Sequence, residues 1–288
     1  MRAFVLLFWT GFVIASLLGN ANVPVLSKFV REKIARGKTK IQEEEELEEH
    51  NDDDEYQSKK RRKKSIETTH GFVVPHAWFT HFYIVGTLWN ATLLATLGVT
   101  IVRSLFQVHV TRRLFESVFV KINDKRAKMD ALGYLIGLMY YVCASISLEE
   151  DVKDDLVLWR RWPWQWIIPV EDETFRIVFA ILLFAYANYK QNECHRYLRD
   201  ARLCTKRKDK YGLISKGWFS LVACPHYFFE CVLYFALCLL LSFSTLSVAM
   251  FLAVVGNLSV AAKGHLDWYR ANIPAFPKRR KAMVPFLF

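Results

Sequence analysis

Six apolar runs decide what this chain can fold into. Each is long enough, or nearly so, to cross about 30 Å of hydrocarbon as a helix. Charged segments separate them, so a chain with 53% hydrophobic residues still carries a net charge of +11. Helices satisfy their own backbone hydrogen bonds in lipid. We therefore predict an all-α, polytopic helical membrane protein with about six to seven transmembrane helices. The runs are residues 3–18, 81–102, 131–148, 175–189, 224–241 and 243–262.

The distribution of charge and apolar residues divides the chain into three parts. Residues 1–22 are a predicted first transmembrane helix or signal anchor, with a cleaved signal peptide as the alternative. Residues 23–71 include "EEEELEEHNDDDEYQSKKRRKK", an acidic block and then a basic one. Such blocks repel and bury little, so we expect a disordered linker with no nucleic-acid partner. Residues 72–288 hold the remaining runs.

Basic segments indicate the orientation in the membrane. Lys and Arg gather at residues 121–128, 196–210 and 270–281, whereas residues 149–173 contain "EEDVKDD" and "VEDE". The positive-inside rule places the basic segments and the C-terminus in the cytosol. Residues 79–110 stay ambiguous, because one crossing leaves the basic linker in the lumen and two crossings must fit within 32 residues. We expect the linker and the C-terminus on the same, cytosolic side.

Polar side chains in or beside the apolar runs are the candidates for chemistry, because ionisable groups in membrane helices are costly and usually functional. His226, Glu230 and Tyr234 recur every four residues and so share one helical face. No Gly-rich nucleotide loop or hydrolase motif is present. The cysteines spaced by seven from Cys224 to Cys238 have no paired His or CxxC, so we predict no metal site. The other polar clusters are His81 with Tyr83, Arg112 and Arg113 with Glu116, Gln191 with His195, and His265 with Tyr269.

Several segments resemble the steroid 5α-reductase family. "FPKRRKAMVPFLF" (276–288) resembles its YPxxRKAxxPFxF ending, and "HVTRRLFESVFV" (109–120) resembles its H-x-x-[KR]-R-L-x-E segment. The polyprenol reductase branch is the most similar, through "VPHAWFTHFYIVGTLWN" (74–90), "GLMYYV" (137–142) and "QNECHRYLRDAR" (191–202). The resemblance covers most of the chain after the linker and implies a membrane catalytic domain there.

The resemblance also implies an activity and a site. It implies an NADPH-dependent oxidoreductase of the endoplasmic reticulum membrane, which reduces the α-isoprene double bond of polyprenol or polyprenal and supplies dolichol for N-glycosylation. The expected catalytic residues, which would stabilise charge on the substrate oxygen, are His81, Tyr83, Arg113 and Glu116. The residues expected to bind NADPH are Gln191, His195, Arg199, Arg202, His226, Glu230, His265 and Tyr269.

Two departures from the steroid-reducing members bear on the substrate. Phe82 and Val110 stand nearest to positions where those members hold the 3-oxo group with Glu and Tyr. A long-chain isoprenoid lipid is therefore the expected substrate. The alternatives are a 3-oxo-steroid 5α-reductase, a trans-2-enoyl-CoA reductase, and a non-catalytic transporter or scaffold. The isoprenoid chain length, the choice between alcohol and aldehyde, and the oligomeric state stay open.

Overall fold

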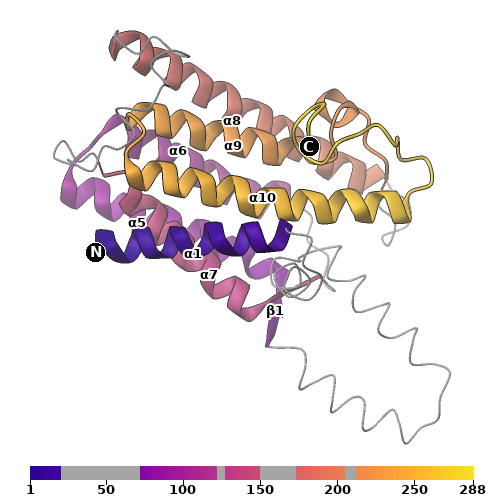
Figure 1. The fold of residues 1–288 in the computed structure, drawn as a ribbon, viewed down its shortest axis with the longest axis horizontal. Helices are drawn as coiled ribbons and strands as arrows, with labels where there is room; N and C mark the ends of the chain where they lie inside the picture. The colour runs from indigo at the N-terminus through magenta and orange to yellow at the C-terminus, as the bar shows by residue number, and fades with distance from the viewer. Residues whose placement is uncertain (21–71, 122–126, 150–172, 205–211) are drawn as a thin grey trace, which may run out of the picture.

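Within the described residues of the computed structural model, seven α-helices form an elongated bundle and run roughly parallel or antiparallel to one another (Figure 1). The structure describes residues 1–20, 72–121, 127–149, 173–204 and 212–288. The predicted linker, residues 23–71, lies outside them. The helices are α1 (Arg2–Asn20), α5 (Phe79–Leu97), α6 (Ile101–Phe115), α7 (Ala131–Ser147), α8 (Glu173–Cys204), α9 (Pro225–Leu240) and α10 (Thr245–Asn272).

Short elements join some of these helices. Strands β1 and β2 pair antiparallel, and a π-helix, η2, continues α6 without a break. The fold is mostly helical, as predicted, but the all-α prediction omits this small sheet. The bounds are β1 Val73–Pro75, β2 Lys128–Asp130, η1 His76–Trp78, η2 Glu116–Val120 and η5 Gly217–Ser220.

Helices α1 and α10 are long and apolar enough to cross a membrane, judged by length and composition. Helices α7 and α9 are also apolar but shorter, with 17 and 16 residues. Helix α8 has 32 residues and extends well beyond the predicted run 175–189. Its C-terminal part, which is polar, therefore continues past the apolar segment.

The apolar run 81–102 lies in the region where the sequence left one or two crossings open, and the structure divides it between two helices, α5 and α6. Helix α5 ends at Gly98, whose φ of 95° is in the left-handed region that favours glycine. Thr100 then caps α6, because its hydroxyl accepts a hydrogen bond of 3.2 Å from the Arg103 amide. Helices α5 and α6 pack against each other, so the chain reverses direction here.

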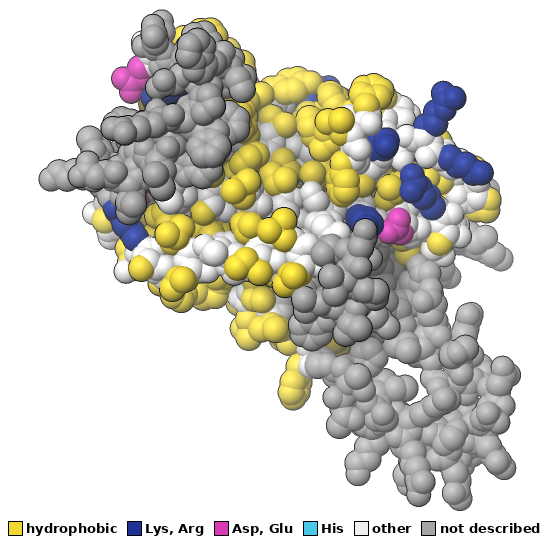
Figure 2. Space-filling model, viewed as in Figure 1, with side chains coloured by type: hydrophobic (Ala, Val, Ile, Leu, Met, Phe, Trp, Pro, Cys, Tyr) yellow, Lys and Arg dark blue, Asp and Glu magenta, His cyan; other side chains and the backbone are white. Residues whose placement is uncertain are grey.

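One end of the bundle is defined by the helices that end or begin there. Figure 1 shows α1, α6, α8 and α10 ending where α5, α7 and α9 begin. We call this the C-terminal end of the bundle. On the face shown in Figure 2, hydrophobic side chains cover the middle of the bundle, and most of the visible Lys and Arg side chains gather at the C-terminal end.

Small residues allow close helix packing. A Cβ atom on Gly137 of α7 would lie 2.5 Å from Cζ of Phe82 on α5. A Cβ atom on Gly256 of α10 would lie 2.6 Å from Cβ of Ser16 on α1. Because real carbon atoms do not approach so closely, a larger residue at either position would force the neighbouring helix or side chain to shift.

The last residues of the chain hold the C-terminal end together. Arg280 is buried and donates hydrogen bonds of 2.7 Å to the carbonyl of Ile214 and to Oγ of Ser215. Phe276 stacks on Tyr269 of α10, with ring centroids 5.2 Å apart. Residues 273–288 therefore connect α10 with the segment that precedes α9, and we call them the C-terminal clasp.

Candidate active site

A cavity of about 770 Å³ lies at the C-terminal end of the bundle, a size typical of ligand and cofactor sites. Its wall combines polar groups from α6, α8 and α9 with apolar groups from α1, α7 and α10. Eleven of the twelve predicted site residues lie on this wall, and His81 is the exception. The eleven are Tyr83, Arg113, Glu116, Gln191, His195, Arg199, Arg202, His226, Glu230, His265 and Tyr269.

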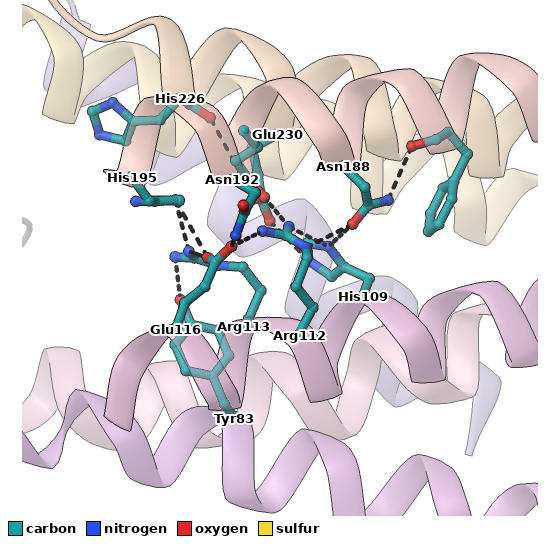
Figure 3. Close-up of polar contacts among 12 residues, drawn as sticks. Tyr83, His109, Arg112, Arg113, Glu116, Asn188, Asn192, His195, His226 and Glu230 are labelled. Carbon is teal, nitrogen blue, oxygen red and sulfur yellow. Dashed lines mark hydrogen bonds and ion pairs between the residues drawn. The ribbon is translucent and has the colours of Figure 1, made fainter. Parts of the chain in front are cut away.

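Arg113 lies at the centre of the polar network (Figure 3). Its guanidinium donates to the Tyr83 hydroxyl at 2.7 Å, to the Glu116 carboxylate at 2.5 Å and to Nε2 of His195 at 2.6 Å. Arginine has no acceptor, so the Tyr83 oxygen must accept this hydrogen bond. The hydroxyl proton of Tyr83 is therefore left to donate to another group, and Tyr83 lines the cavity.

Glu116 binds both arginines at the point where α6 gives way to the π-helix η2. It is buried, 2% exposed, and accepts hydrogen bonds from Arg112, Arg113 and Asn192. Burial alone would raise the pKa of this carboxyl, but the guanidinium groups of Arg113 and Arg112 hold its pKa below the ordinary value. Burial, with Arg113 beside it, lowers the pKa of His195 well below its ordinary value. We therefore assign Glu116 as a carboxylate and His195 as a neutral imidazole.

Arg112 belongs to the same network. From the sequence it could simply anchor a helix at the headgroups, but its side chain is directed toward α8. It donates to Gln191 and, through Nε, to Oδ1 of Asn188 at 3.0 Å. Asn188 and Asn192 are participants that the sequence did not predict. They share a face of α8 with Gln191 and His195, and this spacing of three and four residues could have revealed them.

Glu230 connects α9 to the network. The Gln191 amide donates to the Glu230 carboxylate and, at 3.3 Å, to the carbonyl of His226. Nε2 of the buried His109 lies 3.4 Å from Oε1 of Glu230. The predicted stripe on α9 is thus divided, because His226 and Glu230 line the cavity while Tyr234 is buried and absent from its wall.

The remaining predicted residues extend the wall toward the outer part of the C-terminal end. Nε2 of His265 lies 3.2 Å from the Tyr227 hydroxyl, and the two rings are stacked. Tyr227 was not predicted, although it follows His226 directly. Arg199 and Arg202 lie on the polar extension of α8. They place two cations on the cavity wall, which suits a phosphate-bearing cofactor.

His81 lies apart from the cavity. Its Nδ1 is 2.9 Å from the Tyr134 hydroxyl of α7, and both side chains are only partly buried. Of the two predicted residues His81 and Tyr83, only Tyr83 lies on the cavity wall.

Comparison with known proteins finds related reductases. Residues 159–288 match the family model of 3-oxo-5-alpha-steroid 4-dehydrogenase. The chain is 27% identical over 250 residues to a polyprenal reductase of Caenorhabditis elegans, covering 74% of this chain and 79% of the relative. It is 26% identical over 263 residues to polyprenal reductase 1 of Arabidopsis thaliana, covering 75% and 82%. It is also 26% identical over 269 residues to the human polyprenal reductase, covering 75% and 79%.

These matches, with the helical bundle and its polar cavity, define an oxidoreductase. The chain is similar to the steroid 5α-reductase family over residues 159–288, and to the polyprenal reductases over about three quarters of its length. The resemblance predicted from the sequence motifs is confirmed.

Proposed function

We propose that this protein uses NADPH to saturate the α-isoprene double bond of polyprenal in the endoplasmic reticulum membrane, and so supplies the dolichol series for N-glycosylation. The observation that carries the proposal is the Tyr83 hydroxyl on the cavity wall, which accepts a hydrogen bond from Arg113 and retains its own proton. The names of the similar proteins support the same substrate.

The chemistry requires a donor at the substrate oxygen. NADPH, when bound, supplies a hydride to the alkene carbon β to the carbonyl. The aldehyde oxygen takes up negative charge, and the Tyr83 hydroxyl is the group on this wall suited to stabilise it. A proton added at the α-carbon then completes the saturation. An allylic alcohol has no conjugated oxygen to accept the charge, so we propose the aldehyde as the direct substrate.

The polar wall fits a nicotinamide dinucleotide phosphate. The imidazoles of His195 and His226 line the cavity beside Gln191, whose amide is already bonded within the network, and Arg199 and Arg202 add cations on α8. Because Glu116 and Glu230 are already held by buried donors, the polar wall is ordered before a ligand binds. We propose that Arg199 or Arg202 contacts the 2′-phosphate that distinguishes NADPH from NADH.

The apolar wall fits a lipid substrate. Phe8, Phe12 and Ile136 line the cavity, and so do two exposed residues, Gly11 on α1 and Leu132 on α7. The wall thus reaches the apolar outer surface of the bundle. A long isoprenoid could place its aldehyde near Tyr83 and leave the rest of its chain in the bilayer.

The residues near the two departures also favour an isoprenoid. Phe82 lines the cavity and packs against Gly137, while Val110 is fully buried and absent from the wall. Neither position offers a second polar contact for a 3-oxo steroid. This apolar arrangement supports a substrate with a single polar atom.

The proposal includes a cytosolic C-terminus. NADPH is charged and comes from the aqueous phase, and the residues proposed to bind it lie at the C-terminal end of the bundle. The Lys and Arg side chains on that end support a cytosolic side by the positive-inside rule.

The test uses purified protein with NADPH and either pure polyprenal or pure polyprenol. We expect NADPH oxidation only with polyprenal, and a product two mass units heavier that keeps its aldehyde. Rapid, stoichiometric reduction of pure polyprenol contradicts the aldehyde assignment. Formation of polyprenol from polyprenal would show a carbonyl reductase instead. Preferential turnover of a 3-oxo-4-ene steroid or a trans-2-enoyl-CoA would favour the corresponding rival.

A further inference from the structure

The end of the C-terminal clasp is a small loop that closes on itself. The Met283 amide donates to the Phe288 carbonyl at 2.8 Å, and the Phe288 amide donates back to the Val284 carbonyl at 3.0 Å. Met283 is buried, whereas Phe286 and Leu287 are 84% and 80% exposed. The loop is therefore tied at its base and presents two large apolar side chains at its tip.

The backbone at the tip is in an unusual conformation. Phe286 has a φ of 66°, in the left-handed region that bulky residues rarely adopt. The loop keeps this conformation although it brings neither apolar side chain into the protein interior. Exposed apolar groups held in this way indicate an interaction surface.

The position of the clasp indicates which surroundings the tip meets. The Ala223 amide donates to the Lys281 carbonyl at 2.8 Å, and the Cys224 amide donates to the Ala282 carbonyl at 2.9 Å. Pro225 follows at once and begins α9, which is apolar. Figure 1 shows the C-terminus beside the start of α9 rather than at the far tip of α10. The tip is thus level with the point where an apolar helix begins.

Neighbouring side chains match the edge of a bilayer. Leu221, in the segment that pairs with the clasp, is 41% exposed and adds a third apolar side chain. Lys278 and Arg279 are exposed earlier in the clasp. An apolar tip with cations close by in the sequence is suited to the boundary between lipid headgroups and acyl chains, where anionic headgroups attract the cations.

We propose that Phe286 and Leu287, with Leu221, insert into the cytosolic leaflet and anchor the C-terminal clasp to the bilayer surface. The occupant of this apolar surface is lipid, not a second copy of the chain. The anchor gives the clasp a fixed level at the membrane, and the clasp in turn holds Tyr269 and Ile214 on the cavity wall. The proposal does not depend on which substrate the cavity reduces.

The experiment measures the depth of the tip in lipid. Leu287 is changed to Cys in a Cys204→Ser protein, because Cys204 is the exposed cysteine and the other five are buried. The new thiol carries an environment-sensitive fluorophore, and the protein is placed in nanodiscs with lipids brominated near the headgroup. We expect blue-shifted emission and roughly twofold quenching by these lipids, as for an interfacial depth.

Two matched labels calibrate the result. Ala271→Cys marks the exposed end of α10 and should report water, and Leu252→Cys marks an exposed position in the apolar first half of α10 and should report the acyl region. A Leu287 label that behaves like the Ala271 label overturns the proposal. The proposal is also overturned if the emission is blue-shifted but not quenched by the brominated lipids, and if this blue shift increases with the number of protein copies per nanodisc. That result would identify a second copy of the chain as the occupant.

Discussion

The change Tyr83→Phe tests the proposed oxygen donor directly. It removes one hydroxyl and keeps the ring, which packs against Phe79 and Tyr141 with centroids 5.6 and 5.5 Å away. Arg113 keeps its hydrogen bonds to Glu116 and His195, so no charge is left without a partner. We therefore expect a folded protein in which a single hydrogen-bond donor is missing.

The size of the effect follows from that loss. Removing one preorganised donor to a developing oxyanion raises the barrier by about 3 to 4 kcal/mol, or about 10²- to 10³-fold in rate. Tyr83 should matter little for cofactor affinity, because the groups proposed for NADPH lie on α8, α9 and α10. Single-turnover oxidation of bound NADPH by excess polyprenal, followed at its absorbance, isolates the hydride step.

The controls are variants of two polar residues outside the cavity, the imidazole of His81 and the hydroxyl of Tyr134. His81→Phe and Tyr134→Phe each break the contact between these two side chains, and neither residue lines the cavity. Both should keep the hydride step within about twofold of the wild-type rate, since neither removes a transition-state contact. A wild-type rate in Tyr83→Phe, or an equal loss in His81→Phe, would refute the reasoning and move the role to Arg113 or Tyr269.

Two further predictions concern the cofactor and the packing of the bundle. Arg199→Ala or Arg202→Ala should raise the KM for NADPH far more than the KM for NADH, because a lost charge-assisted bond to the 2′-phosphate is worth about 1.5 to 3 kcal/mol; equal losses for both cofactors would mean that these arginines only anchor the helix. Gly137→Ala should lower the unfolding temperature, since its Cβ would lie 2.5 Å from Phe82 and overpacking costs about 1 to 3 kcal/mol, whereas Gly264→Ala meets no atom within 4 Å and should not lower it. Equal thermal shifts in the two variants would show that the α5–α7 contact yields easily.

The fold was predictable where apolar length alone decides it, as in α1, α7, α9 and α10. The break between α5 and α6 at Gly98 was not predictable. The apolar composition continues across it, and only the positive φ of Gly98 and the Thr100 cap divide the run into two helices. The polar end of α8 lies outside the apolar run 175–189, since hydropathy does not detect the part of a helix that leaves the apolar layer. Strands of three residues, such as Val73–Pro75, are too short to give a sequence pattern.

The site was predicted mainly through family motifs, and helix geometry could have refined it. His81 and Tyr83 are two residues apart, which places their side chains about 200° apart around a helix. Only one of them can face the cavity, and the structure shows that it is Tyr83. Asn188 and Asn192 have no motif of their own, so only the helical spacing from Gln191 could have indicated them.

The charges of the network would keep the proposed donor, Tyr83, in place before a substrate arrives. Two partly buried guanidinium groups, of Arg112 and Arg113, share the Glu116 carboxylate, and the Glu230 carboxylate lies against His109. Each charge therefore has a partner, which a buried charge requires if it is not to destabilise the fold. Glu116 fixes Arg113, and Arg113 fixes the lone pair of Tyr83 that accepts its hydrogen bond. The hydroxyl proton of Tyr83 is thereby limited to the remaining directions around its oxygen. Little reorganisation of this hydroxyl would then be needed when negative charge develops on a substrate oxygen. A dipole that is already oriented in this way lowers the activation barrier.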